Sequence, residues 1–466
     1  MTKVSSIVRR AGELRDIPLV FLGLGFYRAW LDESLVIFSQ TDTAFLSSKI
    51  VFDMTCGLTA LALALFFAPR AQGQRSRMIA LSAASMVLSS LGLALSFQGS
   101  AAIAALHTLC CVLAAFGMMT LSLLWIEFYA SFNPVRMALC YALALLLGKG
   151  LTVLLAGYND LYRFLFQLAL PVFSGACLYR SRRRVYGARE QDGPSLLLAT
   201  SFPWKPALFI GAYAFASVFS GFSVAQGEEG PLELVGALPA AAVFCSILLS
   251  TKRFDFFSMY GIALPLMVCG FLVLAVVPGA PTSVVSLCVS VSYSAASILV
   301  VLIVCGISYR TGASALRLFG LVRFAQYGAM ALGMLCREML DSLVDSAAAD
   351  IAAFMVVIVF VVVVSAVFAS ERSSYFGWSV ESIATQRGEK VVVPLTAKVE
   401  QVAEERTLTQ REQEVLLQLL HRKTVASIAE DMFIAEGTVK AHIQHIYAKL
   451  DIHSRKELFS LFEGRE

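Results

Sequence analysis

The chain has 466 residues, of which 58% are hydrophobic and 15% are charged, and its mean hydropathy is +0.73. This composition excludes an ordinary soluble protein and predicts that most of the chain lies in a lipid bilayer. The formal net charge of +4 is too small to indicate a nucleic-acid partner, so the distribution of charge along the chain has to decide.

Twelve apolar segments are long enough to cross a bilayer, whose core needs about 20 helical residues. They are 17–38, 45–68, 78–97, 102–126, 136–156, 162–179, 206–225, 232–250, 257–277, 283–307, 316–336 and 350–369. The preceding residues are basic and polar and lack a cleavage signal, so we expect them to be retained. An even number of spans places both ends of the chain on one side of the membrane.

Basic residues are concentrated in alternate loops between these segments. The loops on one side carry clusters such as 70–77 and 180–189, whereas those on the other side carry only Arg163 and Arg337 beside several acids. Cytoplasmic loops are the ones enriched in Lys and Arg. The pattern therefore predicts an inner (plasma) membrane protein with both termini in the cytoplasm.

The longest polar loop inside the membrane region, 180–205, separates two sets of six spans. The sequence FLGLGFY at 21–27 in the first span is similar to FIGAYAF at 209–215 in the seventh, as in related repeats. This layout resembles the major facilitator transporters, and the resemblance implies a twelve-helix transmembrane bundle of 6+6 helices. The loop at 68–77 departs from the facilitator signature because it has basic residues but no acid.

No pattern in the chain predicts a metal site, a cofactor or an enzyme. The ten cysteines are scattered through apolar segments, without CxxC pairs or histidines at metal-ligand spacing. Nucleophile elbows, phosphate loops and paired catalytic carboxylates are also absent from the sequence.

The composition changes to polar after the last span. We expect three domains: a membrane sensor domain at 1–369, a cytoplasmic linker at 370–406 and a small four-helix domain at 407–466. Thr409 with Glu412 forms a capping box that opens the first helix of the small domain, and Thr424 can cap a short second helix. Ser454 with Glu457 forms another capping box that opens the fourth helix.

The third helix of this domain is predicted at 436–450, after a tight turn. Its apolar stripe is Val439, Ile443, Ile446 and Leu450, which leaves a polar outer face. A short helix, a tight turn and a longer helix form a helix-turn-helix unit, which places the second helix in the major groove of DNA. Base contacts are expected from Lys440, Ala441 and Gln444, and phosphate contacts from Thr438, His445, Lys449 and Arg455.

The segments LTQREQEVL (408–416), IAEDMFIAEGTVKAHIQHIYAKL (428–450) and HSRKEL (453–458) resemble the LuxR-type DNA-binding domain. The resemblance implies that Lys440, Ala441 and Gln444 face bases, and that the fourth helix pairs two copies on double-stranded DNA. Leu458, Phe459 and Phe462 would then supply the dimerisation surface. Ala435 departs from the family because a Ser normally caps the recognition helix. The alternative for this domain is a helical bundle that makes only protein contacts.

Ionisable side chains inside the spans are costly, so each is a candidate for ligand binding. The predicted ligand residues are Arg28, Asp32, Lys49, Asp53, Lys149 and Arg323. Arg28 and Lys149 suit an anionic small molecule, with Tyr27, Trp30, His107 and Trp125 available to stack on it or to form hydrogen bonds with it. Alternatively, the Arg28–Asp32 and Lys49–Asp53 pairs neutralise one another on neighbouring helices and only help packing.

The sequence therefore predicts a membrane-embedded transcription regulator that senses a small molecule through its spans and binds promoter DNA as a homodimer. The alternative is a facilitator-like transporter with a regulatory DNA-binding tail.

Overall fold

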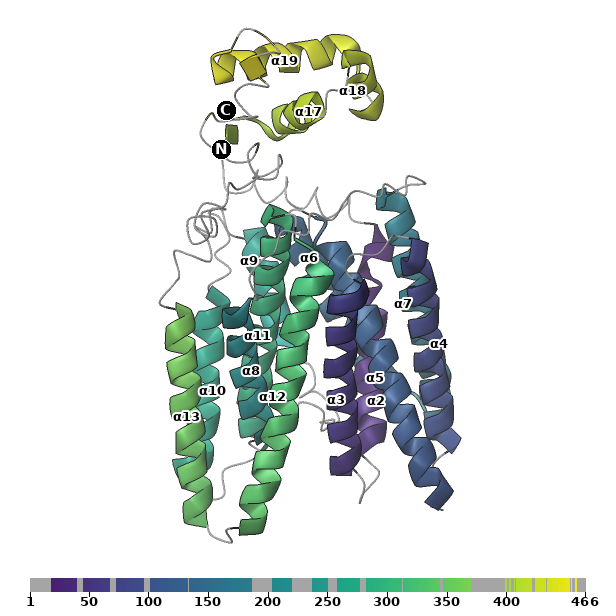
Figure 1. The fold of residues 1–466 in the computed structure, drawn as a ribbon, viewed down its shortest axis with the longest axis vertical. Coiled ribbons are helices and arrows are strands. Elements are labelled where there is room, and N and C mark those ends of the chain that lie inside the picture. The colour runs from purple at the N-terminus through teal and green to yellow at the C-terminus, as the bar shows by residue number, and fades with distance from the viewer. Residues whose placement is uncertain are drawn as a thin grey trace. The chain divides into compact units, whose positions relative to one another are not determined.

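The computed structural model describes most of the membrane region and the central part of the C-terminal region. The described residues are 18–39, 45–67, 73–95, 101–132, 134–186, 203–219, 237–249, 258–276, 282–311, 313–343, 347–369, 399, 402–403, 406, 408–420, 424–432, 434–452, 454 and 457–458. Every regular element among them is helical, as the composition predicts (Figure 1). The chain divides into two compact units, a membrane unit before residue 376 and a C-terminal unit after it.

The membrane unit contains one helix for each of the twelve predicted spans. They are α2 (Leu24–Ser39), α3 (Phe45–Ala62), α4 (Gly73–Leu95), α5 (Ala101–Tyr129), α6 (Pro134–Ala156), α7 (Asp160–Tyr186), α8 (Trp204–Phe219), α9 (Leu238–Leu249), α10 (Ser258–Val276), α11 (Thr282–Thr311), α12 (Ala315–Leu343) and α13 (Ala347–Ala369). A 3₁₀ turn, η1 (Leu19–Leu22), precedes α2, and a π-helical segment, η2 (Leu63–Phe67), continues α3.

Length and composition of these helices confirm a multi-pass membrane protein. Among the described residues, seven helices are long and apolar enough to cross a bilayer, and three shorter apolar helices accompany them. The described parts of α8 and α9 are shorter than the spans predicted at 206–225 and 232–250, and the remainder of those spans lies outside the described residues.

The twelve helices form two bundles of six, as Figure 1 shows by the separate purple-to-blue and teal-to-green groups. In the first bundle α4 packs on α5 and α7, and α2 packs on α6 and α7; in the second, α8 packs on α12 and α13. The bundles meet mainly where α3 contacts α12 and where α6 contacts α9. At Gly320 of α12, an added Cβ atom would lie 2.7 Å from the carbonyl oxygen of Ala60, so this small residue permits close helix packing.

The helices differ in how much of their surface the protein covers. The protein buries 78% of the residues in the apolar window of α5 but only 33% of those in the window of α7. Large apolar side chains such as Leu58, Leu88 and Phe173 remain exposed on the outside of the unit. These surfaces are suited to lipid, because a bilayer rewards apolar exposure that water would penalise.

The C-terminal unit has its own apolar core, formed by α17 (Gln410–Leu420), α18 (Val425–Met432) and α19 (Glu436–Leu450). Val415, Leu416 and Ile446 are its fully buried centre. Val399 and Ala403 pack into the same core. The end of the predicted linker, before the expected domain start at residue 407, therefore supplies side chains to the interior of this unit.

Candidate functional site

A short turn joins α18 to α19 in the C-terminal unit. The Ile434 amide donates to the carbonyl of Ala429 at 3.0 Å, and the amides of Thr438 and Val439 donate to Ala435 at 2.9 and 3.2 Å. Ala435 occupies the N-cap position of α19 without a side-chain hydrogen bond, as its sequence departure predicted. At the other end, Asp451 adopts a left-handed conformation, with φ of 56°, that ends the helix.

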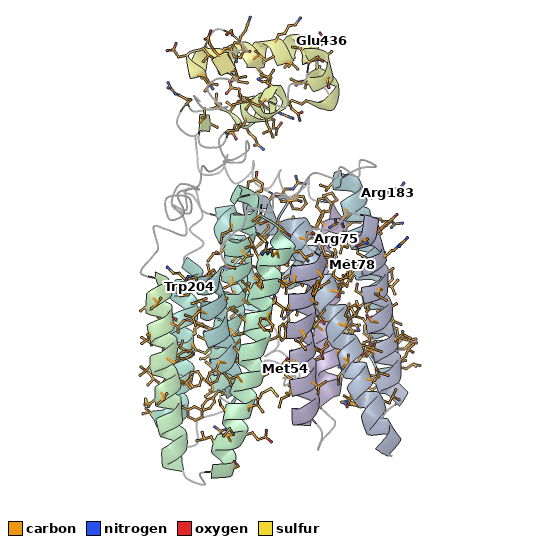
Figure 2. All side chains as sticks on the ribbon, viewed as in Figure 1. Met54, Arg75, Met78, Arg183, Trp204 and Glu436 are labelled. Carbon is orange, nitrogen blue, oxygen red and sulfur yellow. The ribbon has the colours of Figure 1, made fainter. Side chains whose placement is uncertain are left out.

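The two faces of α19 have opposite character. Val439, Ile446 and Leu450 are buried against α17 and α18, and Ile443 packs beside them. The other face is exposed from Glu436, labelled at the start of α19 in Figure 2, to Ala448. It includes Gly437, Thr438, Lys440, Ala441, Gln444 and His445. We call these six residues the outer face of α19.

The capping box predicted at the start of α17 is present. The Thr409 amide donates to Glu412 Oε2 at 2.7 Å, and the Glu412 amide donates to Thr409 Oγ1 at 3.3 Å. Thr424 and Ser454 also accept hydrogen bonds from the amides of Ser427 and Glu457, at 3.3 and 3.2 Å. The caps at Thr409 and Thr424 mark the starts of α17 and α18, whereas α19 begins without a side-chain cap.

Glu412 also joins α17 to α19. Its nearly buried carboxylate accepts a hydrogen bond from Lys449 Nζ at 2.7 Å, and His445 Nδ1 lies 3.9 Å away. Burial raises the pKa of this carboxyl, but the hydrogen bonds from Lys449 and Thr409 outweigh it, and the pKa lies below its usual value. The ammonium of Lys449, expected on a DNA phosphate, thus has a partner inside the domain.

The structure changes the expected dimerisation surface. Leu458 is fully buried in the core of its own chain, so it is a core residue and cannot also cover a partner. The prediction was wrong because the apolar side of a short helix does not reveal which apolar partner it meets. Phe459, Phe462 and Arg455 lie outside the described residues.

Five of the six candidate ligand residues of the membrane unit form ion pairs, and one of these pairs joins two helices. Asp32 of α2 pairs with Lys149 of α6 at 2.8 Å, while Arg28 is 3.8 Å from the other Asp32 oxygen. Lys49 and Asp53 of α3 form a separate pair at 2.7 Å. α2 packs mainly on α6 and α7, whereas α3 packs mainly on α12 and α5. Both pairs of the packing alternative are therefore present, and the first also includes Lys149.

Arg323 of α12 has neutral polar neighbours. Its Nη1 donates to Gln326 Oε1 at 2.7 Å, Gln326 Nε2 donates to the Tyr293 hydroxyl, and the guanidinium lies 4.8 Å from the centre of the Phe319 ring. Within the described part of the chain, Arg323 Nε is buried without a hydrogen-bond partner. A buried donor of this kind costs stability and is a position where a ligand could bind.

Four tyrosines interact electrostatically with both Arg28 and Arg323. Tyr27 of α2, Tyr141 of α6, Tyr293 of α11 and Tyr327 of α12 each interact electrostatically with Arg323. Arg28 interacts with the same four tyrosines. We call these six side chains, Tyr27, Arg28, Tyr141, Tyr293, Arg323 and Tyr327, the arginine–tyrosine cluster; α2 and α6 belong to the first bundle, and α11 and α12 to the second.

The aromatic residues chosen from the sequence are mostly engaged elsewhere. Trp30 Nε1 donates to Ser90 of α4 at 3.1 Å, Trp125 Nε1 donates to Ser174 of α7 at 3.0 Å, and His107 lies 3.8 Å from Cys111 Sγ. Tyr27 alone of the four belongs to the arginine–tyrosine cluster. Tyr141, Tyr293 and Tyr327 were missed because a tyrosine in an apolar span carries no local signal of a charged neighbour.

A third group of charges ties α4, α5 and α7 together. Glu127 of α5 accepts hydrogen bonds from Arg75 at 2.9 Å and from Arg182 at 3.0 Å. Arg75, labelled with Met78 on α4 in Figure 2, also donates to the carbonyl of Phe67 at the end of η2. This arrangement satisfies a backbone group at a helix end and supports packing within the first bundle.

The two units of the chain are similar to different groups of known proteins. Residues 406–462 match the family described as bacterial regulatory proteins, luxR family. The chain is 47% identical over 55 residues to an HTH-type transcriptional regulator of Aeromonas salmonicida, covering 12% of this chain and 28% of that one. It is 38% identical over 68 residues to the transcriptional regulatory protein LiaR of Bacillus subtilis, covering 15% and 32%. These two matches thus span about a third or less of the relatives' lengths.

A shorter relative is matched over most of its length. The chain is 42% identical over 50 residues to the spore germination protein GerE of Bacillus subtilis, covering 11% of this chain and 68% of that protein. The membrane unit is similar in fold to a bacterial homologue of the iron transporter ferroportin in an outward-facing state, with a TM-score of 0.56 and 14% identity over 76% of this chain and 98% of that one. That identity supports the fold alone.

The matched residues contain the capped α17, the turn after α18 and the outer face of α19, which are the parts that a helix-turn-helix domain requires. The membrane unit shares its helical architecture with the bacterial ferroportin homologue. Through its C-terminal helix-turn-helix domain, joined to this multi-pass membrane unit, the chain belongs to the luxR family of bacterial regulatory proteins.

Proposed function

We propose that this protein is a membrane-embedded transcription regulator whose spans sense a small molecule and whose α19 binds promoter DNA. The observation that carries this proposal is the outer face of α19, which is exposed while the opposite face forms the core. A helix that is anchored on one side and polar on the other is suited to lie in the major groove.

The exposed residues suggest a division of roles. Lys440 and Gln444 have side chains that reach guanine and adenine acceptors and donors, while Gly437 and Ala441 leave room for close approach. Thr438 and His445 lie at positions suited to phosphate contacts. Lys449 would reach a phosphate only by exchanging its bond with Glu412, so its main role in this proposal is to hold α19 on α17.

The membrane unit would act as the sensor, with both termini on the cytoplasmic side of the inner membrane. The alternation of basic loops supports this orientation, and a DNA-binding tail requires it. Binding of a ligand between the two bundles would favour one of their arrangements, and the linker would transmit that change by altering how readily two DNA-binding domains pair. The size of the response is limited by the difference in ligand affinity between the arrangements.

The test of DNA readout begins with chromatin capture by the full-length protein, which identifies a bound operator. On that operator, Lys440→Ala together with Gln444→Ala should weaken binding about 100-fold, because each base contact contributes roughly 1–3 kcal/mol. Glu414→Ala is the matched control, since Glu414 is exposed on α17 and pairs with Arg411 at 2.8 Å. Unchanged binding by the double variant would refute readout by α19.

The facilitator-like fold also supports a second candidate, a transporter with a regulatory tail. Uptake assays with vesicles containing the protein truncated after residue 375 separate the two. A sensor should bind its ligand without accumulating it, whereas a transporter should accumulate it inside the vesicle.

A further inference from the structure

We propose that the arginine–tyrosine cluster binds a small aromatic anion, such as an aromatic carboxylate, held by Arg28 from the first bundle and Arg323 from the second. This inference rests on the proposed sensing function and names the chemical class of its ligand. It is carried by the charge balance, the unsatisfied hydrogen-bond donor and the aromatic surroundings of this place in the membrane unit.

The charges of the candidate ligand residues that the structure describes in the membrane unit do not cancel. The six ionisable residues Arg28, Asp32, Lys49, Asp53, Lys149 and Arg323 comprise four bases and two acids. Asp32 is closest to Lys149, at 2.8 Å, and Asp53 is closest to Lys49, at 2.7 Å. The neighbouring Glu33 forms an ion pair with Arg163 of α7 at 3.0 Å. Among these described residues the bases therefore exceed the acids by two, and the two guanidinium groups are the bases farthest from a carboxylate.

Uncompensated charge inside a membrane protein is expensive, so a bound anion would be strongly stabilising there. The same excess disfavours a metal cation by direct repulsion. A guanidinium group matches a carboxylate better than an ammonium group does, because its planar fork can donate two parallel hydrogen bonds. Lys49 and Lys149 lie 2.7 and 2.8 Å from their carboxylate partners, whereas Arg28 is 3.8 Å from Asp32 and Arg323 donates to the neutral amide of Gln326.

Arg28 and Arg323 have donors to spare for such a ligand. Arg28 is 3.8 Å from Asp32, longer than a normal hydrogen bond, and 36% of its side chain is exposed although it lies within a span. Arg323 Nε is buried without a partner among the residues that the structure describes. A carboxylate that reached both side chains would satisfy these groups and link α2 to α12.

The tyrosines of the cluster are the reason why we propose an aromatic ring in the ligand. The four tyrosines interact electrostatically with both guanidinium groups, and the Tyr293 hydroxyl accepts a hydrogen bond from Gln326, the partner of Arg323. A flat ring can stack on a tyrosine face. The tyrosine hydroxyls can donate to an anion or to a ring substituent.

Binding between the bundles would also explain how a ligand biases the arrangement. Arg28 and Arg323 belong to different bundles, so an anion that contacts both favours the arrangement in which they are close. The α3–α12 contact, where Gly320 allows close approach, would be part of that arrangement.

The test measures thermal unfolding of the full-length protein in lipid nanodiscs with phthalate, benzoate or benzyl alcohol. Phthalate and benzoate should raise the unfolding temperature saturably, with phthalate more effective, whereas the uncharged alcohol should not. Arg28→Gln and Arg323→Gln should each weaken phthalate binding about tenfold or more. Arg323→Lys should recover only part of it, since the ammonium keeps the charge but loses the fork.

Arg337→Gln is the matched control, because Arg337 is on α12 outside the cluster and lies over the Phe354 ring at 5.9 Å. It should bind phthalate as the wild type does. Absence of stabilisation by either anion, or equal loss in Arg337→Gln and Arg323→Gln, would overturn the inference.

A promoter reporter distinguishes this inference from the proposed function. If phthalate binds through Arg28 and Arg323 but no aromatic anion alters transcription, the anion site stands and sensing fails. If a neutral compound alters transcription equally in wild type and Arg323→Gln, sensing stands and the anion site is refuted.

Discussion

The membrane unit buries its polar side chains between helices, whereas the C-terminal unit exposes its polar side chains at the surface. In the membrane unit, Leu58 and Phe173 face outward while Asp53 is almost completely buried between helices. In the C-terminal unit, Val439 and Ile446 form the interior while Lys440 and Gln444 are exposed. The comparison teaches that solvent decides where a functional group can be found: inside a bundle surrounded by lipid, and outside a domain surrounded by water.

Buried charge also serves the two units differently. In the C-terminal unit, Glu412 and Lys449 form a complete pair that holds α19 against α17. In the membrane unit, the carboxylates Asp32 and Asp53 are paired, but Arg28 and Arg323 retain donors. We infer that the first arrangement stabilises a surface for DNA and that the second leaves a position for a ligand. Four substitutions test this contrast, from the largest expected effect to the smallest.

Leu458→Ala should destabilise the C-terminal unit by about 2–5 kcal/mol, because it leaves a cavity in the core. Thermal unfolding of a fragment from residue 395 to 466 would measure it at several protein concentrations. If Leu458 covered a partner instead, the variant would lose dimerisation while the unfolding temperature of the monomer stayed unchanged.

Gly117→Leu should destabilise the membrane unit by about 1–3 kcal/mol or more, because a Cβ at this position of α5 would lie 2.7 Å from the Ser82 carbonyl of α4. Gly150→Leu is the control, since nothing lies within 4 Å of its added Cβ. Unfolding in detergent provides the measurement. The C-terminal unit should still bind its operator, and loss of DNA binding by the detergent-solubilised variant would show that the units depend on each other.

Glu412→Gln should destabilise the C-terminal unit by about 1.5–3 kcal/mol at neutral pH, because it removes a charged acceptor from Lys449. The pKa of Glu412 is lowered on folding, so its contribution is present above the ordinary Glu pKa of about 4.3 and is lost as the pH falls through the lower folded value. Urea unfolding from pH 7 to pH 3 would show a smaller decline for the variant. Parallel declines would contradict the role of this pair.

Ala435→Ser should stabilise α19 by about 0.5–1 kcal/mol, because Ala435 has extended N-cap geometry and no side-chain acceptor. Thermal unfolding would show the gain, with Ala448→Ser on the exposed face as a control that should be slightly destabilising. An equal effect of both substitutions would exclude capping as the cause. Operator affinity should change little, since the outer face of α19 is retained.

Several elements could be predicted from the sequence because their signals are local. The helix at Glu436–Leu450 follows from its apolar period, and the start of α17 follows from Thr409 and Glu412. The twelve spans follow from hydropathy, since a bilayer of fixed thickness needs a fixed length of apolar helix. The missing cap at Ala435 was also visible in the sequence.

Tertiary structure alone decided which distant residues meet. Asp32 pairs with Lys149 because α2 packs on α6, and Tyr293 reaches Arg323 through Gln326 because α11 and α12 bring them together. Leu458 lies in the core of the C-terminal unit, together with residues of α17, α18 and α19. Periodicity and hydropathy describe one face of one helix, whereas a site between helices depends on the side chains that neighbouring helices supply.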